Sequence, residues 1–313
     1  MRSNNSPDLP PTGNLWRTDE LTDLGYGSRS IKSLLKSGSL VRLRYGCYLR
    51  ASVWNAQSAG VRSRQLIYAH AHGTRTTSTG QFAYSHTSAA RLHRLYLWKV
   101  DDLIHLLQRM NPSSERHGRD VRCHTRPFSD DEIVTLDGLR VTSLERTAAD
   151  CAIMLAYRQS LIVMDHALRL GADRNLLQKM ADALDGRRGV RTFRRALENA
   201  DPRSESPGET LTRELILRLR ITPPTPQVEV ASALGRHRLD FAWKKEKVAL
   251  EVDGKVKYFD FKPTDEVLYQ ERQRENALTE EGWKFLRITW KDLFNESRFK
   301  YRVLQALAGR PAA

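Results

Sequence analysis

The sequence has 313 residues, a formal net charge of +14 and a hydrophobic content of 40%. This length predicts two or three domains, and the hydrophobic content is sufficient for buried cores. The excess of Lys and Arg favours a polyanionic partner. Nucleic acid is favoured over a membrane, because no apolar run approaches the length of a membrane-spanning helix.

The beginning of the sequence and its cysteines indicate a cytoplasmic protein. Residues 1–14 are polar and contain prolines, which predicts a disordered tail without the apolar core of a signal peptide. The three cysteines, Cys47, Cys123 and Cys151, are scattered and odd in number. We therefore expect a reducing compartment and exclude a zinc cluster built from cysteines.

Residues 15–52 predict a winged helix-turn-helix. Thr18 is expected to cap a short helix and Ser28 to cap a second, basic helix. The alternating segments 40–44 and 47–50 then predict a hairpin. We expect the second helix to enter the major groove and the hairpin to contact phosphates, whereas a structural domain with an ordinary charged surface is the alternative. The residues expected to contact DNA here are Ser28, Arg29, Lys32, Lys36, Arg42 and Arg44.

Residues 53–200 predict a mostly helical middle domain with some strands, and no chemistry is assigned to it. One helix is expected over 53–72, and short strands are expected at 104–107 and 121–124. The segment 133–141 predicts two further strands around an Asp-Gly turn. Several helices are expected to complete this domain before residue 200.

Four histidines in this middle region raise the question of a metal site. They are His70, His72, His86 and His93. Their spacing follows no consistent ligand pattern, and no clear carboxylate accompanies them. We therefore expect core or solvated histidines rather than metal ligands.

Residues 201–313 predict an α/β sandwich in the order helix, three strands, helix, strand, helix. The first helix follows a linker, with Ser206 as N-cap and Glu209 at the third position, which is the pattern of a capping box. Two alternating segments, 238–243 and 248–253, flank a charged loop and predict an antiparallel hairpin. In its first strand, residues 239, 241 and 243 are expected to share one face.

Asp240 falls directly opposite Glu251 if this hairpin closes with Trp243 opposite Val248, which places their Cβ atoms roughly 5 Å apart. Like charges in that position destabilise a strand pair, whereas a bound cation removes the cost, and hard divalent ions prefer oxygen ligands. Asp253 lies two residues further on the same side. This pattern favours metal-dependent attack on a phosphodiester, and a solvated face with its charges paired to nearby cations is the alternative.

The first module resembles a known family. Residues 21–48, which include LVRLRYGCY at 40–48, are similar to the N-terminal domain of AbiEi-type antitoxins, and SHTSAA at 85–90 and TSLERT at 142–147 are similar to the middle of related regulators. Those antitoxins are bacterial transcriptional repressors of type IV toxin–antitoxin operons. The resemblance implies double-stranded DNA and an operon toxin as partners, a homodimer, and a nucleoid-associated location in the cytoplasm.

The C-terminal part resembles a second family. Residues 204–308 are similar to the PD-(D/E)XK restriction-endonuclease-like superfamily, nearest to domains related to very-short-patch-repair endonucleases. The resemblance implies that Asp240 and Glu251 hold Mg²⁺ or Mn²⁺ and that Glu209 joins them, although a capping-box glutamate needs no catalytic role. The segments that carry it are SPGE at 206–209, LDFAW at 239–243, EVDG at 251–254, and RENAL at 274–278 leading into GWKFLR at 282–287.

The sequence departs from that superfamily at one position. Asp253 stands where the superfamily usually has a lysine. Three alternatives stay open. Either Lys255 or Lys257 takes the role of that lysine, or Asp253 is a further metal ligand, or the site is degenerate and inactive. Arg274 is expected to approach the phosphate or to pair with Glu275.

The expected fold class is therefore α+β and multidomain, with a winged helix-turn-helix at 15–52, a middle domain at 53–200 and a restriction-endonuclease-like domain at 201–313. Two functions stay open. One is a DNA-binding protein with a Mg²⁺-dependent endodeoxyribonuclease domain, and the other is an AbiEi-like regulator whose nuclease fold is inactive. RNA in place of DNA also stays open, because no residue that reads a 2′-hydroxyl is identified.

Overall fold

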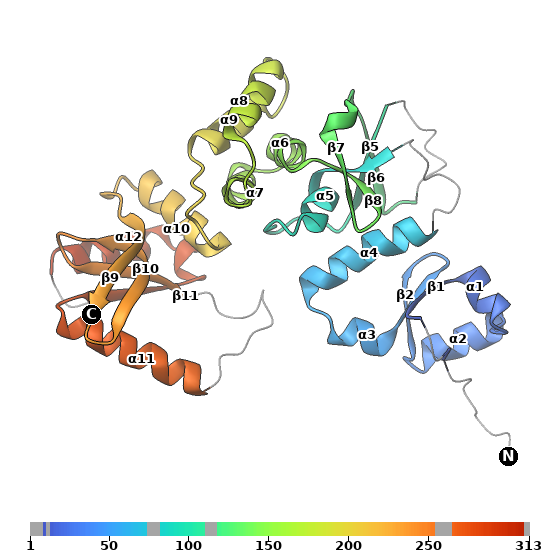
Figure 1. The fold of residues 1–313 in the computed structure, drawn as a ribbon, viewed down its shortest axis with the longest axis horizontal. Coiled ribbons are helices and arrows are strands. Elements are labelled where there is room, and N and C mark those ends of the chain that lie inside the picture. Colours follow the sequence, from blue (N-terminus) through green and yellow to red (C-terminus); the bar gives the residue numbers. More distant parts are fainter. Residues whose placement is uncertain (1–8, 11–12, 74–81, 110–117, 254–264, 310–313) are drawn as a thin grey trace. The chain divides into compact units, whose positions relative to one another are not determined.

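The computed structural model describes residues 9–10, 13–73, 82–109, 118–253 and 265–309. These residues form a mixed α and β protein with a three-stranded, a four-stranded and a five-stranded sheet (Figure 1). This agrees with the expected α+β class. Within the described ranges, no helix combines the length and the apolarity that crossing a bilayer requires.

The chain divides into two compact units. The first comprises residues 1–94 and 100–147, and the second comprises residues 95–99 and 148–313. The domain boundaries expected after residues 52 and 200 fall inside these units, so the division into separate domains there stays a prediction. Each unit is described separately below.

The first unit begins with two helices and a three-stranded sheet of order β1-β3-β2. Its hairpin has the ranges that the alternating pattern predicts. The two helices are not capped as expected, because Arg17 and Gly27 are the N-caps, while Thr18 and Ser28 are the first helical residues. The elements are β1 (Leu15–Arg17), α1 (Thr18–Asp23), α2 (Ser28–Lys36), β2 (Leu40–Arg44) and β3 (Cys47–Arg50).

Among the described residues, the rest of the first unit contains three helices and a five-stranded mixed sheet, and the strands predicted at 104–107, 121–124 and within 133–141 are confirmed. The order of this sheet is β6-β5-β4-β8-β7, with β5 parallel to β6 and β4 parallel to β8. The central strand β4 was not predicted, because three residues are too few to show an alternating pattern. The single helix expected over 53–72 is two helices. The elements are α3 (Ala51–Ala56), α4 (Ala59–Gly73), β4 (Phe82–Tyr84), α5 (His86–Leu92), β5 (Ile104–Gln108), β6 (Val121–Thr125), β7 (Ile133–Leu136) and β8 (Leu139–Thr142).

The second unit contains a helical part and a four-stranded sheet of order β12-β11-β10-β9. The strand β11 is antiparallel to β10 and parallel to β12. The predicted order of helix, three strands, helix, strand, helix is confirmed. The elements are α7 (Tyr157–Arg169), α8 (Arg174–Ala183), α9 (Val190–Glu198), α10 (Pro207–Arg218), β9 (Thr225–Ser232), β10 (Gly235–Trp243), β11 (Val248–Asp253), α11 (Asp265–Glu280), β12 (Lys284–Thr289) and α12 (Glu296–Leu307), and α6 (Leu144–Met154) begins in the first unit.

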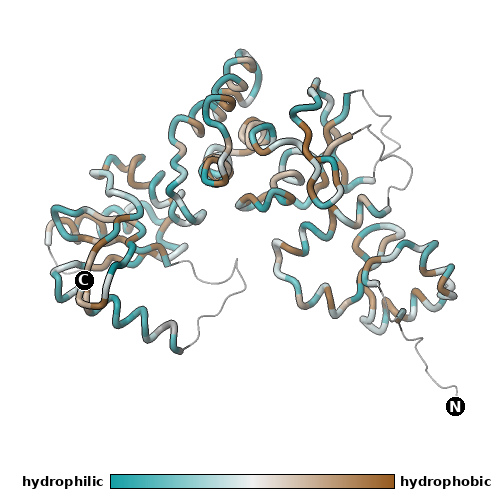
Figure 2. The backbone as a smooth tube through the Cα atoms, viewed as in Figure 1, coloured by the Kyte–Doolittle hydropathy of each residue, from teal (hydrophilic) through white to brown (hydrophobic). Residues whose placement is uncertain are grey.

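Helices cover both faces of this four-stranded sheet. On one face, α10 and α12 contribute Leu211, Leu215 and Phe299 to a buried cluster with strand residues such as Phe241. On the other face, Leu278 of α11 packs against the strands. Figure 1 shows α10 and α11 on opposite sides of the strands, and Figure 2 shows that α11 is hydrophilic along much of its length. The carboxyl end of β11 therefore lies in a layered α/β framework.

Candidate active site

The hairpin of β10 and β11 closes in the predicted register. Trp243 pairs with Val248 and Phe241 pairs with Leu250. The pairing ends there, one residue short of Asp240 on β10 and one residue short of Glu251 on β11. The two carboxylates that the sequence brings together as a candidate metal site thus lie on neighbouring strands.

The alternation along β10 breaks at Asp240. Phe241 belongs to the cluster beneath α10 and α12, whereas Leu239 belongs to the opposite cluster beneath α11. The expectation that residues 239, 241 and 243 share one face is therefore wrong. On β9, Gln227 lies between the two residues that pair with Leu239 and Phe241, and its φ is 52°. A positive φ is uncommon outside glycine, and such backbone irregularities concentrate at functional sites.

Asp240 and Glu251 are each held through one oxygen. Asp240 Oδ2 accepts a hydrogen bond of 2.9 Å from the Val252 amide. Glu251 Oε1 lies 3.1 Å from Arg274 Nη2, which also donates to the Arg238 carbonyl at 2.6 Å. Among the described residues, the other oxygen of each carboxylate has no hydrogen-bond donor.

Arg274 contacts Glu251 rather than the neighbour that the sequence suggests. Its Nη2 atom forms the ion pair with Glu251, and its Nη1 atom lies 3.6 Å from Glu271. Glu275, the alternative partner expected from the sequence, instead pairs with Arg287 at 2.6 Å. Arg274 thus lies beside the carboxylate of Glu251. A substrate phosphate bound at this carboxylate would also be within reach of the Arg274 guanidinium.

Glu209 completes the N-terminus of α10 and faces the same region. Ser206 Oγ accepts a hydrogen bond from the Glu209 amide at 3.2 Å, which confirms the predicted cap. In return, Glu209 Oε1 accepts from Ser206 Oγ at 2.8 Å. Glu209 Oε2 accepts from the Glu205 amide and from Gln227 Nε2, each at 2.9 Å. Both carboxylate oxygens of Glu209 are therefore engaged.

Gly208 explains why α10 begins so close to β11. A Cβ atom at this position would lie 2.7 Å from Cγ1 of Val252, which is closer than side chains pack. Glycine is thus required for the close approach of the helix to the strand. This contact places Glu209, the next residue, beside the strand end that carries Glu251.

The carboxylates influence one another electrostatically. Burial, together with the charge of Asp240, raises the pKa of Glu209 to about 7. Burial and the Asp240 charge likewise raise the pKa of Glu251 to about 7, against the lowering effect of Arg274. Burial also raises the pKa of Asp240. A cluster of this kind gains stability from a cation, and perturbed carboxylates are typical of functional sites.

The donor set fits a hard divalent cation in its chemistry, but the three carboxylates do not converge. Asp240 and Glu251 offer the oxygen ligands that Mg²⁺ and Mn²⁺ prefer. Three potential metal ligands would have to lie close to one another to share an ion. In the described part of the chain, three histidines have ligand atoms within 4.8 Å of one another, and the three acids do not form such a group. The hydrogen bonds of Glu209 hold it in the helix cap, so Asp240 and Glu251 would be the two protein ligands.

The structure describes only one of the three remaining residues predicted for the active site, and it adds one residue that was not predicted. Asp253 is the last residue of β11, and its side chain is partly exposed. Lys255 and Lys257 lie outside the described residues. Gln227 was not predicted, because one polar residue in an alternating strand carries no signal of its own. Its hydrogen bond to Glu209 spans 18 residues and appears only in the folded chain.

Four of the residues predicted to contact DNA lie on α2 in the first unit, and all four are exposed. Ser28, Arg29, Lys32 and Lys36 face away from the buried stripe of this helix, which is formed by residues 31 and 34. We call Arg29, Lys32 and Lys36 the basic face of α2. Burial of the opposite side thus leaves three cationic side chains together on the surface.

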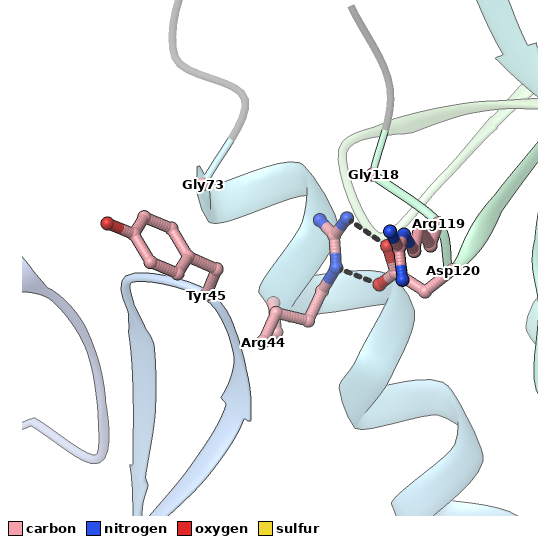
Figure 3. Close-up of a pocket in the computed structure, with 7 residues that line it drawn as sticks. Arg44, Tyr45, Gly73, Gly118, Arg119 and Asp120 are labelled. Carbon is pink, nitrogen blue, oxygen red and sulfur yellow. Dashed lines mark hydrogen bonds and ion pairs between the residues drawn. The ribbon is translucent and has the colours of Figure 1, made fainter. Parts of the chain in front are cut away.

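One of the two hairpin arginines predicted to contact DNA is exposed, and the other is not. Arg42 is exposed and stacks over the ring of Tyr45, with its Cζ atom 5.2 Å from the ring centre. Arg44 is mostly buried and forms an ion pair with Asp120, in which its Nη2 atom donates at 2.9 Å (Figure 3). This hydrogen bond lowers the pKa of Asp120. The expectation that Arg44 faces outward is therefore wrong.

A pocket of about 420 Å³ lies beside this ion pair (Figure 3). Its lining includes Arg44, Tyr45, Arg119 and Asp120. Tyr45 itself is 92% exposed at the tip of the hairpin. The pocket belongs to the first unit, whereas the carboxylates belong to the second, so it is not part of the candidate active site.

Comparisons with known proteins show a remote structural similarity. No family model and no curated protein matches the chain. A solved structure, the RV2827C protein from Mycobacterium tuberculosis, is similar with a TM-score of 0.39 and 14% sequence identity. The match covers 70% of this chain and 84% of that chain. A similarity of this size supports no argument about function.

Proposed function

We propose that this chain is a DNA-binding protein whose C-terminal part is a metal-dependent phosphodiesterase of the restriction-endonuclease-like kind. The observation that supports the proposal most is that the charge of Asp240 acts on both Glu209 and Glu251, in a site where the pKa of each of these two glutamates is raised to about 7. Burying carboxylates within electrostatic reach of one another costs free energy unless a cation accompanies them. The exposed basic face of α2 and the net charge of +14 support a nucleic-acid partner.

In this hypothesis, Asp240 and Glu251 hold Mg²⁺ or Mn²⁺. Such an ion would polarise the scissile phosphate and lower the pKa of the attacking water. The Val252 amide orients Asp240 through its hydrogen bond. Arg274 is positioned to exchange its contact with Glu251 for a substrate phosphate, because a guanidinium binds both groups in the same geometry. Gln227 keeps Glu209 oriented toward the strands.

A regulator with an inactive nuclease fold is the second candidate. Three observations favour it: Glu209 is engaged through both oxygens, Arg274 neutralises Glu251, and Asp253 stands at the usual lysine position. In that case, the basic face of α2 would bind an operator in the manner of AbiEi-type antitoxins, with an operon toxin and a second copy of the chain as partners. The C-terminal part would then bind without cleaving.

A cleavage assay distinguishes the two candidates. Purified protein is incubated with supercoiled, linear and single-stranded DNA, with and without Mg²⁺ or Mn²⁺. If the site is active, we expect metal-dependent nicking that the Asp240→Asn/Glu251→Gln double variant loses by at least about 100-fold, because removing groups that stabilise the transition state has effects of this size.

The matched control is Glu246→Gln, which removes an exposed acid from the loop between β10 and β11. This variant should cleave like the parent protein. Duplex DNA binding without cleavage by all three proteins would instead support the inactive regulator. Metal-dependent cleavage by the double variant at the rate of the parent protein would remove Asp240 and Glu251 from the active site.

A further inference from the structure

Three histidines in the first unit form a cluster that the proposed function does not use. His86 begins α5, His105 lies in β5 and His124 lies in β6. One ring nitrogen from each lies within 4.8 Å of the others. His86 and His105 are 3% and 0% exposed, and His124 is partly buried. We call these residues the histidine cluster.

The fold brings the three residues together from distant segments. The strands β5 and β6 are parallel, with His105 beside Arg122 and Leu107 beside His124. His105 and His124 therefore lie two positions apart in register, on the same face of the sheet. His86 has a φ of 49°, in the left-handed region that few non-glycine residues adopt. The Ser85 amide donates to the His105 carbonyl at 3.0 Å, so the start of α5 lies beside β5.

The nitrogen atoms are close to the spacing of a metal site. His105 Nδ1 lies 2.8 Å from His124 Nε2, and the rings of His86 and His124 are stacked with centroids 3.6 Å apart. In a tetrahedral zinc site with Zn–N bonds of about 2.0–2.1 Å, two ligand nitrogens lie about 3.3 Å apart. A small separation of His105 and His124, with rotation of the His86 ring out of its stack, would reach that geometry.

The remaining nitrogens have the surroundings that metal-bound histidines need. His105 Nε2 is buried without a hydrogen-bond partner, and Asp101 Oδ1 lies 3.6 Å from it. His86 Nδ1 lies 3.0 Å from Ser85 Oγ. Metal-bound histidines usually donate their second N–H to a carboxylate or another acceptor. If His105 binds a metal through Nδ1, its ring proton must be on Nε2, which faces Asp101. This arrangement would give the buried Nε2 atom of His105 an acceptor for its proton.

We propose that His86, His105 and His124 bind a transition-metal ion, Zn²⁺ in the first place, through His86 Nε2, His105 Nδ1 and His124 Nε2. Imidazole nitrogens suit zinc and neighbouring transition metals, whereas Mg²⁺ prefers oxygen, so this site differs in chemistry from the carboxylates of the second unit. Three histidines leave one coordination position for water or an anion.

The protonation state of the cluster also suits metal binding. Burial lowers the pKa of His86 and His105, and it lowers that of His124 to about 4. The three imidazoles are therefore neutral at pH 7. Neutral imidazole is the form that ligates, so a metal ion has few protons to displace.

Zinc binding is measured on the full chain after removal of metal with a chelator, by titration with Zn²⁺ against a chromophoric competitor. We expect the parent chain to bind one Zn²⁺ tightly. The His124→Gln variant should bind Zn²⁺ with an affinity lower by about 100-fold or more, because even the loss of a residue that only orients a ligand has effects approaching this size. The matched control is His93→Gln, which removes a histidine of the same unit whose Nε2 contacts the Thr142 carbonyl. Asp240→Asn/Glu251→Gln separates this site from the carboxylates. Both control proteins should keep the affinity of the parent chain.

X-ray absorption of the zinc-loaded parent protein tests the same site without a substitution. We expect scattering from three imidazoles, and tetrahedral d–d absorption when Co²⁺ replaces Zn²⁺. Coordination by oxygen alone, or an unchanged affinity in a folded His124→Gln protein, would overturn the proposal. If His124→Gln fails to fold, the spectrum of the parent protein decides. The result is independent of DNA cleavage.

Discussion

Asp240 is the residue through which the carboxylates of the second unit interact. Its charge raises the pKa of Glu209 and that of Glu251. It lies where β10 loses its alternation and where Gln227, on the neighbouring strand, has a positive φ. The local structure thus holds acidic groups together at a cost to folding, which is typical of sites that bind a charged ligand.

This cost predicts a pH dependence of stability. Because the folded-state pKa of Glu251 is about 7 against 4.5 in the unfolded chain, the folded protein binds the proton more tightly. The stabilisation by the protonated carboxyl is complete below about pH 4.5 and is lost as the pH rises through about 7. A shift of this size corresponds to roughly 3 kcal/mol. Urea unfolding at several pH values, without metal, measures it.

The Glu251→Gln variant tests the cause of that dependence. The amide mimics the protonated form, so the variant should be increasingly more stable than the parent protein as the pH rises from about 5 to about 8. Added Mg²⁺ should reduce the difference by stabilising the ionised parent. Glu246→Gln, on the exposed loop, serves as control. A constant difference between parent and Glu251→Gln at all pH values would show that the carboxyl does not titrate in this range.

At the scale of elements, α7 and α10 are joined by a buried polar contact. Asp165 of α7 is 1% exposed, and it accepts hydrogen bonds from Arg213 Nη2 at 2.7 Å and from Thr210 Oγ1 at 2.8 Å. The Asp201 amide donates to the same carboxylate at 2.8 Å. Ile162 of α7 also belongs to the hydrophobic cluster beneath α10. This contact fixes the helix whose N-terminus carries Glu209.

Replacing Asp165 by Ala should destabilise the protein by about 3–5 kcal/mol, because Arg213 would remain buried without its partner. Urea denaturation, followed by circular dichroism, measures the change. Asp173→Ala is the matched control, since this exposed carboxylate caps α8 through Asn175 and its loss should cost about 1 kcal/mol. Equal losses in the two variants would contradict a special role for the buried pair.

The basic face of α2 gives a second prediction at this scale. The Arg29→Ala/Lys32→Ala variant should bind duplex DNA more weakly and lower the slope of log affinity against log salt concentration by about 2, because each phosphate contact contributes about 0.9. Fluorescence anisotropy at several salt concentrations measures both quantities.

The control for this experiment is Arg187→Ala/Arg188→Ala. It removes the same charge from an exposed turn between α8 and α9. If the two double variants lose affinity and salt dependence equally, general charge and not α2 accounts for binding. An unchanged affinity and slope in Arg29→Ala/Lys32→Ala would remove α2 from the DNA interface.

At the scale of the whole molecule, the candidate functions are distributed over two units. The basic face of α2 and the histidine cluster belong to the first unit, and the carboxylates belong to the second. A chain that binds DNA through one unit raises the effective DNA concentration at the other, because the two are covalently joined. In the nuclease hypothesis, cleavage should therefore weaken with the same α2 substitutions that weaken binding.

The sequence by itself determined the order of most elements and the register of the β10–β11 hairpin. These follow from local signals: the apolar period of two in 238–243 and 248–253, the charged loop between them, and Ser206 with Pro207 at the start of α10. Each of these patterns involves residues that are close in the chain, so it can be recognised from the sequence without knowledge of the fold.

Only the tertiary structure decided which side chains meet. Arg44 pairs with Asp120 across 76 residues, Gln227 reaches Glu209 across 18, and His86 meets two strand histidines that no spacing rule connects to it. The short central strand β4, which assembles the five-stranded sheet, left no alternating pattern to recognise. Contacts of this kind depend on how sheets and helices pack, and packing is a property of the folded chain that local periodicity does not encode.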